Sequence, residues 1–245
     1  METVFFAKEF KNKNLSNHII FICDHASNHI PKKYKKLGVS DSDLDSHIAF
    51  DIGAKNFTIN LAKELKQSYF LSNFSRLLID PNRKEIDREL IPVSSFGVKI
   101  PKNLHISNDE REYRINFFYE NYHRNLKNFV KNKINEYNKV FLVSIHSFTK
   151  SSKNFDRGVE VGLLWNKTMD LLLPIQRNLK ENKIHFGRNY PYSGFHYNYT
   201  LDRLCINIEL KSITIEIRND LICNQKGIKK YLTLMSNIFK GFLNE

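Results

Sequence analysis

The sequence contains few residues of the kinds that mark specialised folds, with three cysteines, six prolines and nine glycines among 245 residues. Cys23, Cys205 and Cys223 are an odd number without paired spacing, so neither a disulfide framework nor a zinc ribbon is indicated. The thinly spread prolines and glycines exclude collagen-like and low-complexity chains. No apolar run approaches the ~20 residues that a membrane-spanning helix needs.

The first residues also lack the features of a secretory signal peptide. Residues 1–8 begin with an acidic side chain and contain no basic region, apolar stretch or small-residue cleavage site. We therefore expect a cytoplasmic protein whose thiols are reduced and which has no membrane partner.

Negative charge is also in short supply, since 38 Lys and Arg face 26 Asp and Glu for a formal net charge of +12. A clustered basic surface binds nucleic acid by releasing phosphate counterions. Here the lysines are scattered among abundant Asn and Ile, so no binding face is indicated and a nucleic-acid function is disfavoured. The positive balance fits a small anionic substrate.

The arrangement of apolar residues indicates the fold class. No repeat, linker or block of like charge divides the chain, so we predict one domain over residues 1–245. Apolar, β-branched runs indicate strands at residues 18–23, 69–71, 77–79, 140–145, 159–164 and 204–217. Helical spacing, with Ser40 as a cap for the first helix, indicates helices at 41–66, 109–137, 167–182 and 227–242. Alternating strands and helices predict an α/β fold with a mostly parallel sheet.

One long connection interrupts this alternation. Residues 84–108 contain Pro92, Gly97 and Pro101 and show little periodicity. Connections of this length inside a compact domain are usually functional lids or disordered. We predict an irregular segment, with a lid over a binding site as one of the two interpretations.

Polar side chains collect where four predicted strands end. The sets are Asp24 with His25, Asp80 with Asn82 and Arg83, His146 with Ser147, and Glu216 with Arg218. Open α/β sheets bind ligands beyond the carboxyl ends of their strands, so these groups share one cleft if the strands are adjacent and parallel. The simpler interpretation is that strand ends meet solvent anyway, but imidazoles, acids and guanidiniums together favour a site.

A possible metal site involves the segment HIAFD at residues 47–51. His47 and Asp51 would share one face of the predicted helix, where a structural His–Asp pair and a metal site both fit a buried carboxylate. His25, Asp51 and His146 together would make a three-ligand set for zinc, with a fourth position open to water. This grouping is inferred, because no short ligand motif such as HExxH is present.

Two further segments are candidates for substrate binding. Arg76 precedes the DPNR segment at residues 80–83, and the planar fork of arginine suits a carboxylate. A structural salt bridge between Asp80 and an arginine is the alternative. In the turn NYPYSG, Tyr192 and Ser193 are candidates for the rim of a pocket, or for a plain surface turn.

Segments in consistent order along nearly the whole chain carry a family resemblance. They are CDHASNHIP (23–31), HIAFDIGA (47–54), FSRLLIDPNR (74–83), IP…G…IPKN (91–103), YH (122–123), IHSF (145–148), NYPYSG (189–194) and IEIRNDLI (215–222). Together they resemble the N-formylglutamate amidohydrolase family. That family is similar in fold to the zinc carboxypeptidase and aspartoacylase group, which implies a central mixed sheet flanked by helices.

The resemblance implies an amidase that cleaves an N-acyl amino acid such as N-formylglutamate and releases a small acid. By this resemblance His25 and His146 match the metal-binding histidines of the wider group. Asn82 and Arg83 match its clamp for the substrate carboxylate, and Glu216 matches its catalytic glutamate.

One position departs from the wider group. Its first motif has a glutamate three residues after the histidine, where this sequence has Asn28. The third metal ligand therefore stays open among Asp51, Asp24 and His47.

The expected mechanism follows from these roles. A Zn²⁺ ion would lower the pKa of its water to about 7 and polarise the scissile carbonyl. Glu216 would take the proton and pass it to the leaving nitrogen, Arg76 or Arg218 would stabilise the oxyanion, and Arg83 would orient the substrate carboxylate. The alternatives are a metal-free hydrolase that uses the same cleft and a basic, non-catalytic binding protein.

Overall fold

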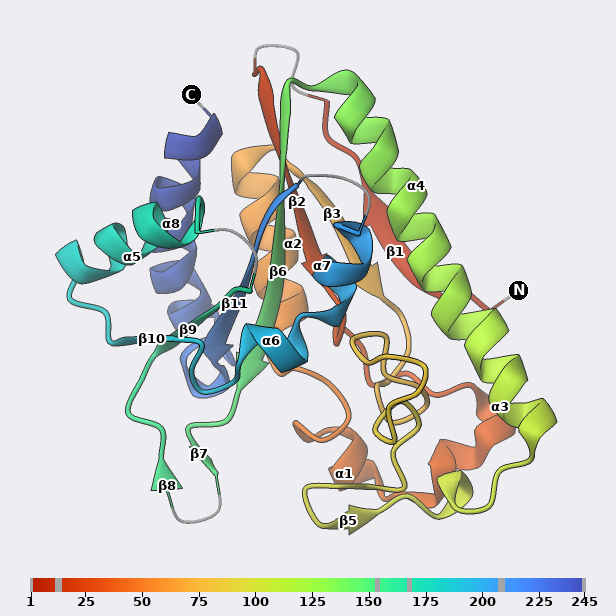
Figure 1. The fold of residues 1–245 in the computed structure, drawn as a ribbon. Coiled ribbons are helices and arrows are strands. Elements are labelled where there is room, and N and C mark those ends of the chain that lie inside the picture. Colours follow the sequence, from red (N-terminus) through yellow and green to blue (C-terminus); the bar gives the residue numbers. More distant parts are fainter. Residues whose placement is uncertain (1, 12–14, 153–154, 167–168, 207–209, 244–245) are drawn as a thin grey trace.

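The computed structural model describes residues 2–11, 15–152, 155–166, 169–206 and 210–243. Within these residues a seven-stranded sheet forms the centre of the molecule (Figure 1). The strand order is β1 (Phe5–Lys8), β3 (Ser68–Ser72), β2 (Asn17–Cys23), β6 (Lys139–Phe148), β11 (Lys211–Arg218), β9 (Val161–Leu164) and β10 (Phe186–Arg188).

The sheet is mixed and mostly parallel. Strands β3, β2, β6 and β11 run parallel to one another. Strand β1 pairs antiparallel with β3, and β9 pairs antiparallel with β11 and parallel with β10. The predicted α/β class with a central mixed sheet is therefore confirmed.

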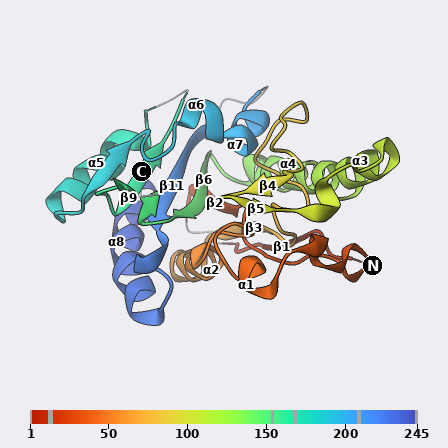
Figure 2. The ribbon, with the colours of Figure 1, turned by 90° about the horizontal axis from the view of Figure 1, so that it is seen from below.

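Helices cover both faces of the sheet (Figures 1 and 2). One face packs against α2 (Ala54–Leu65), α5 (Leu172–Glu181) and α8 (Gln225–Leu243). The other packs against α4 (Asn121–Glu136) and α7 (Tyr199–Leu204), with a contribution from the short α1 (Asp41–Leu44). None of the helices in the described ranges is long and apolar enough to cross a membrane.

Shorter elements connect these layers. They are α3 (Asn108–Arg114), a π-helical turn (Ile115–Glu120) that runs into α4, α6 (Gly194–Tyr197), the 3-10 turns η1 (Lys32–Gly38), η2 (Pro101–Asn103) and η4 (Asn219–Leu221), and the hairpin strands β4 (Ser94–Ser95), β5 (Val98–Lys99), β7 (Ser151–Ser152) and β8 (Phe155–Asp156).

Strand β2 illustrates why the central strands are continuous apolar runs in the sequence. Ile19 and Phe21 belong to the core beneath α2 and α8, whereas Ile20 and Ile22 belong to the core beneath α4. Successive side chains of a strand point to opposite faces, so a strand covered on both sides needs apolar residues at every position. Polar residues are consequently few in the middle of β2 and gather towards its ends.

The helix predicted over residues 41–66 is interrupted, so that prediction was wrong in its middle. Ser40 caps α1, as expected, by accepting a hydrogen bond from the backbone N–H of Asp43 at 3.1 Å. Residues 45–53 then form turns before α2 begins. Gly53 has a φ of 82°, and a Cβ there would lie 2.3 Å from the carbonyl oxygen of Ile222. A contact with a distant segment thus imposes a left-handed backbone that a continuous helix does not contain.

Two strand predictions were also wrong in part. Residues 77–79 form a buried turn instead of a strand, because a short apolar run is compatible with any buried segment. Strand β11 begins only at Lys211, since Leu204 ends α7. The other predicted strands and helices are present with shifted ends, apart from residues 167–168, which lie outside the described residues.

The segment 84–108 is irregular, as predicted, apart from the β4–β5 hairpin and η2. Its far end is held by Arg114, a buried guanidinium at the end of α3. Nη1 of Arg114 donates to the carbonyl of Leu78 at 3.1 Å and to Oδ1 of Asn103 at 2.7 Å. These bonds tie the segment to the buried turn at residues 77–79.

Candidate active site

A cavity of about 330 Å³ opens where β2, β6 and β11 end. Its polar lining includes His25, His47, Asp51, Arg76, Asp80, Asn82, Arg83, His146, Tyr192 and Glu216. The structure therefore brings together most of the side chains that the sequence placed at strand ends. The carboxyl ends of parallel strands meet at one edge of the sheet, which explains the convergence of His25, His146 and Glu216. The segment 80–83 reaches the same cavity from the buried turn that replaces its predicted strand.

Three adjacent strands position the central side chains. His25 lies two residues beyond the end of β2, while His146 lies within β6, which extends past its predicted end. Glu216 on β11 is the register partner of His146. Backbone pairing inside the sheet thus fixes the positions of the Cα atoms of His146 and Glu216 relative to each other.

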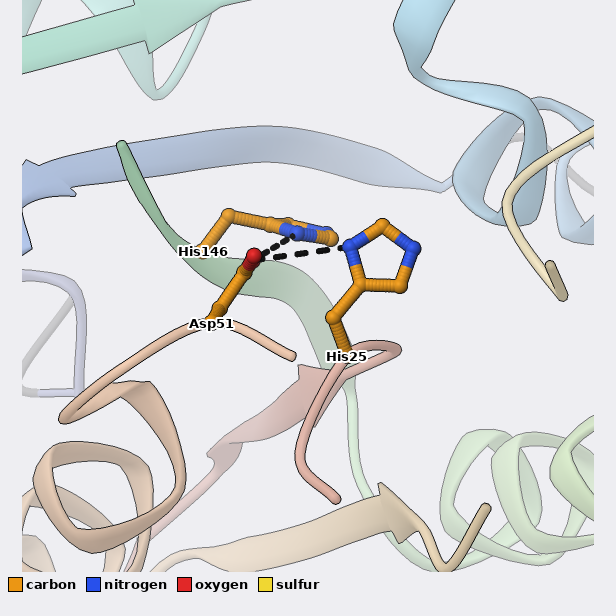
Figure 3. Close-up of side chains that lie close together, drawn as sticks. All are labelled: His25, Asp51 and His146. Atoms are coloured by element: carbon orange, nitrogen blue, oxygen red, sulfur yellow. Dashed lines mark hydrogen bonds and ion pairs between the residues drawn. The ribbon is translucent and has the colours of Figure 1, made fainter. Parts of the chain in front are cut away.

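Asp51 lies between the two imidazoles (Figure 3). Its Oδ2 is 2.8 Å from Nδ1 of His146 and 3.5 Å from Nδ1 of His25. The two rings approach edge to face, with centroids 4.9 Å apart. The backbone N–H of Asp51 also donates to the carbonyl of His25 at 2.9 Å, which anchors the turn before α2 to the end of β2.

The outer nitrogen of each imidazole faces a second carboxylate. Nε2 of His25 bonds Oδ1 of Asp80 at 2.8 Å, and Nε2 of His146 lies 3.5 Å from Oδ2 of Asp24. Asp24 thus lies on the far side of its imidazole from Asp51. With a cation bound, a carboxylate at the outer nitrogen would accept the ring N–H and leave the lone pair of Nδ1, which now faces Asp51, for the cation.

The residues present fit a divalent cation. Ligand atoms of His25, Asp51 and His146 all lie within 4.8 Å of one another, and all three residues are buried. Two imidazole nitrogens and one carboxylate oxygen form a donor set that zinc takes in catalytic sites. Two other side chains were alternatives for the third ligand. Asp24 faces Nε2 of His146, not the Nδ1 that faces Asp51. His47 lies on the Oδ1 side of Asp51, with its Nδ1 3.8 Å from that oxygen, whereas the two imidazoles face Oδ2.

Charges around Asp51 keep it ionised. Burial raises its pKa, but the charges of Arg76 and His25 outweigh burial and hold the pKa well below its usual range. At His47, burial and the charge of Arg76 act together and lower the pKa of the imidazole to about 3. The centre therefore contains a firmly anionic carboxylate beside a neutral imidazole at His47.

Glu216 differs from the other carboxylates of the cavity. Burial raises its pKa to about 7, against the opposing charge of His146. Its Oε2 is buried and has no hydrogen-bond partner among the described residues. A carboxyl group that titrates near neutral pH and has an unoccupied oxygen can accept a proton and release it again.

Arg76 lies at the cavity, whereas Arg218 does not. Arg76 donates to the carbonyls of Ile48 and His47, and its Nη1 lies 3.1 Å from Oδ1 of Asp51. Arg218 is directed to Asp220 by two hydrogen bonds of 2.7 and 3.2 Å and does not line the cavity. A nearby acid in η4 thus pairs with the guanidinium at the end of β11.

The predicted carboxylate clamp lies at one wall of the cavity. Asn82 uses its amide internally, since Nδ2 donates to the carbonyl of Tyr197 and Oδ1 accepts from the backbone of Thr200. Arg83 stacks over the ring of Tyr197 at 4.9 Å, and its Nε bonds Oε2 of Glu89 at 3.1 Å. Nη1 of Arg83 also donates to the carbonyl of Asn82 at 3.1 Å, so Nη2 is the nitrogen of this pair that remains for a ligand among the described contacts.

The turn at residues 189–194 contributes one of its two candidates. Tyr192 lines the cavity. Ser193 instead caps α6, where its hydroxyl accepts from the backbone N–H of Phe195 at 3.3 Å, and it does not line the cavity. The structure thus brings Tyr192 but not Ser193 to the site.

Sequence reasoning missed a ring at the mouth of the cavity. Phe96, at the tip of the β4–β5 hairpin, is 64% exposed, and its ring centroid lies 5.9 Å from that of His47. Its neighbours Ser94 and Ser95 also line the cavity, so the irregular segment 84–108 forms part of the wall. The exposed apolar tip beside Gly97 was the available signal in the sequence.

A buried cleft of this kind, with a place for a cation, a proton acceptor and guanidiniums for anions, defines the class of α/β enzymes that hydrolyse acyl bonds. The family model described as N-formylglutamate amidohydrolase matches residues 17–223. The chain belongs to the N-formylglutamate amidohydrolase family. It is accordingly a hydrolase of amide bonds that acts on N-acyl amino acids.

Two solved structures share the fold of this chain. A gene product of Agrobacterium tumefaciens is 28% identical with a TM-score of 0.90, over 98% of this chain and 94% of that chain. An N-formylglutamate amidohydrolase from Ralstonia eutropha has the same fold, with 18% identity and a TM-score of 0.68 over 98% of each chain. No curated protein sequence matches this chain significantly.

Proposed function

We propose that this chain is a zinc-dependent amidohydrolase that cleaves an N-acyl amino acid with at least one carboxylate, such as N-formylglutamate. One observation carries the proposal. Nδ1 of His25 and Nδ1 of His146 face the same oxygen of Asp51, in the cavity that Glu216 also lines. This donor set and a proton acceptor together are what metal-assisted hydrolysis requires.

When bound, a divalent ion supplies Lewis acidity that polarises the scissile carbonyl and acidifies water. His25, Asp51 and His146 would hold it. Glu216 accepts the proton of the attacking water on its free oxygen and later donates it to the leaving nitrogen. Water thus adds to the acyl carbon, the carbon–nitrogen bond breaks, and a small acid and a free amino acid leave.

Two guanidinium groups stabilise the transition state and bind the substrate. Arg76 is anchored by two backbone carbonyls beside Asp51, so its charge is held in place to stabilise the oxyanion that develops in the transition state. Asp80 contacts His25 through Oδ1 and Arg83 through Oδ2, and Arg83 orients the substrate carboxylate. Family membership makes the chain an enzyme, so the alternative of a non-catalytic binding protein is set aside.

The experiment measures metal content and turnover on the same protein. Elemental analysis should find close to one zinc ion per chain. Hydrolysis should be followed with formyl-, acetyl- and succinyl-glutamate and the corresponding aspartates, before and after chelation and after zinc is restored. Turnover that survives complete removal of metal would favour the metal-free hydrolase. We also retain the cytoplasmic location as a prediction, which fractionation of the producing cells would test.

A further inference from the structure

Tyr122 reaches the metal-binding candidates from the opposite side of the sheet core. It lies on α4, is fully buried, and packs its ring against Phe70 and Phe74 at centroid distances of 5.4 and 6.1 Å. Its hydroxyl donates to Oδ1 of Asp24 at 2.8 Å. This places a buried hydroxyl of α4 on a carboxylate that faces an imidazole.

Asp24 is placed by contacts at both ends. The hydroxyl of Ser72 donates to its backbone carbonyl, which fixes the chain just beyond β2. Its side chain is only 1% exposed, and Tyr122 occupies one of its two oxygens. The other oxygen, Oδ2, faces Nε2 of His146 at 3.5 Å. Neither of these two facing atoms has a hydrogen-bond partner among the residues that the structure describes.

The matching contact at the other imidazole shows what this arrangement does. Asp80 accepts from Nε2 of His25 at 2.8 Å, which directs Nδ1 of that ring towards Asp51. Neutral imidazole has one N–H, so a proton held on Nε2 leaves a lone pair on Nδ1. Asp24 offers Oδ2 to Nε2 of His146 from 3.5 Å, a longer contact than that of Asp80, so the orientation of the Asp24 side chain decides whether this pair can close to a hydrogen bond.

We infer that Tyr122 is a positioning residue for the cation site: by holding Asp24 in one orientation it keeps the ring proton of His146 on Nε2 and presents Nδ1 as a ligand. The inference rests on the proposed function, since it concerns the binding of a divalent ion. A phenylalanine would fill the same space among Phe70 and Phe74, so packing alone does not call for the hydroxyl. A buried hydroxyl is costly unless it is bonded, which makes this contact specific.

The test compares zinc affinities of the wild-type protein and Tyr122→Phe by competition with a chromophoric chelator. Loss of a partner in the outer shell of a metal site typically weakens binding about 10–100-fold. We expect a loss of zinc affinity near the lower end of this range for Tyr122→Phe, because Asp24 remains. We expect a larger loss for Asp24→Asn, because its amide can donate to Nε2 and so favours the tautomer of His146 that carries its proton on Nδ1. The visible spectrum of the Co²⁺-loaded protein should change in both variants.

Tyr231→Phe is the matched control. Tyr231 is a buried tyrosine on α8 whose hydroxyl donates to Glu160, and it does not line the cavity. The Tyr231→Phe variant should have a lower free energy of unfolding than the wild type but the same zinc affinity and the same Co²⁺ spectrum. Unchanged affinity and spectrum in both Tyr122→Phe and Asp24→Asn would overturn the inference alone. Absence of zinc binding in the wild-type protein would overturn the proposed function and the inference with it.

Discussion

Glu216 and His146 are register partners on adjacent parallel strands, β11 and β6. Paired residues of neighbouring strands point to the same face, so both side chains enter the cavity from the most rigid part of the molecule. The next pair inward, Ile215 with Ile145, is fully buried. The distance between the proton acceptor and one imidazole is therefore set by the sheet instead of by a loop.

Replacing Glu216 by Gln should separate binding from chemistry. The amide keeps the shape of the side chain but cannot accept a proton, so we expect kcat to fall by roughly 10²–10⁴. Zinc content should stay at the wild-type level, because Glu216 is not among the candidate ligands. Glu160→Gln is the control, since Glu160 lies outside the cavity and should keep full turnover. Wild-type kcat in Glu216→Gln would exclude the role of this residue.

The two arginines suggested by the sequence should behave differently. Arg76→Ala removes the guanidinium beside Asp51 and should lower kcat by about 10²–10³, the cost of losing a donor to an oxyanion in other enzymes. Arg218→Ala should leave kcat and KM unchanged, because Arg218 is paired with Asp220 away from the cavity. Steady-state kinetics on the preferred substrate decide between the two, and equal losses in both variants would contradict the assignment.

Arg83→Ala should mainly raise KM. A hydrogen bond to a charged group contributes about 1.5–3 kcal/mol, which corresponds to roughly a 10- to 100-fold change. The matching experiment uses a substrate whose carboxylate is replaced by an amide. If Arg83 binds that carboxylate, the variant and the wild type should process the amide equally poorly. A further loss with the amide substrate would show that Arg83 acts elsewhere.

Two buried histidines away from the cavity predict how stability depends on pH. Burial lowers the pKa of His18 to about 4 and that of His123 to about 4, from an ordinary value of 6.5. Between pH 6.5 and 4 these two side chains therefore bind protons in the unfolded chain but not in the folded chain, so their contribution to the free energy of unfolding should fall as the pH drops. Urea denaturation at several pH values measures this slope. His123→Gln should reduce the slope, and an unchanged slope would contradict the assignment.

Gly53→Ala should destabilise the fold more than Gly97→Ala. Both glycines have positive φ, 82° and 87°, so both substitutions strain the backbone. A Cβ at Gly53 would also meet the carbonyl oxygen of Ile222, whereas nothing lies within 4 Å of one at Gly97. We expect the first to cost well over about 1 kcal/mol and the second less, by thermal or chemical denaturation. Equal losses would mean that the clash is relieved locally.

The sequence predicts the central sheet and much of the site for one physical reason. Strands β2 and β6 are buried on both faces, so they are mostly apolar, and the change to polar residues locates His25 just beyond β2 and His146 among the last residues of β6. Glu216 is recognisable in the same way near the end of β11. These positions depend on local pattern together with one rule about parallel sheets.

Other features depend on distant contacts that no local pattern encodes. His47 and Asp51 meet as expected, but through the turn at residues 45–53 and not on one helix face. At the end of that turn, Gly53 has a positive φ and lies so close to Ile222 that a Cβ would not fit. Likewise, spacing alone could not show that Tyr122 on α4 would reach Asp24, since the two approach only after the helix packs on the sheet.

The order of the strands has a consequence for when activity can arise. Strand β11 lies between β6 and β9, although it is the last of the sheet to leave the ribosome. A nascent chain that ends before β11 can already contain both imidazoles and their shared carboxylate, but it has no glutamate to carry the proton. If Glu216 carries the proton as proposed, hydrolysis requires this last strand to be in place between β6 and β9.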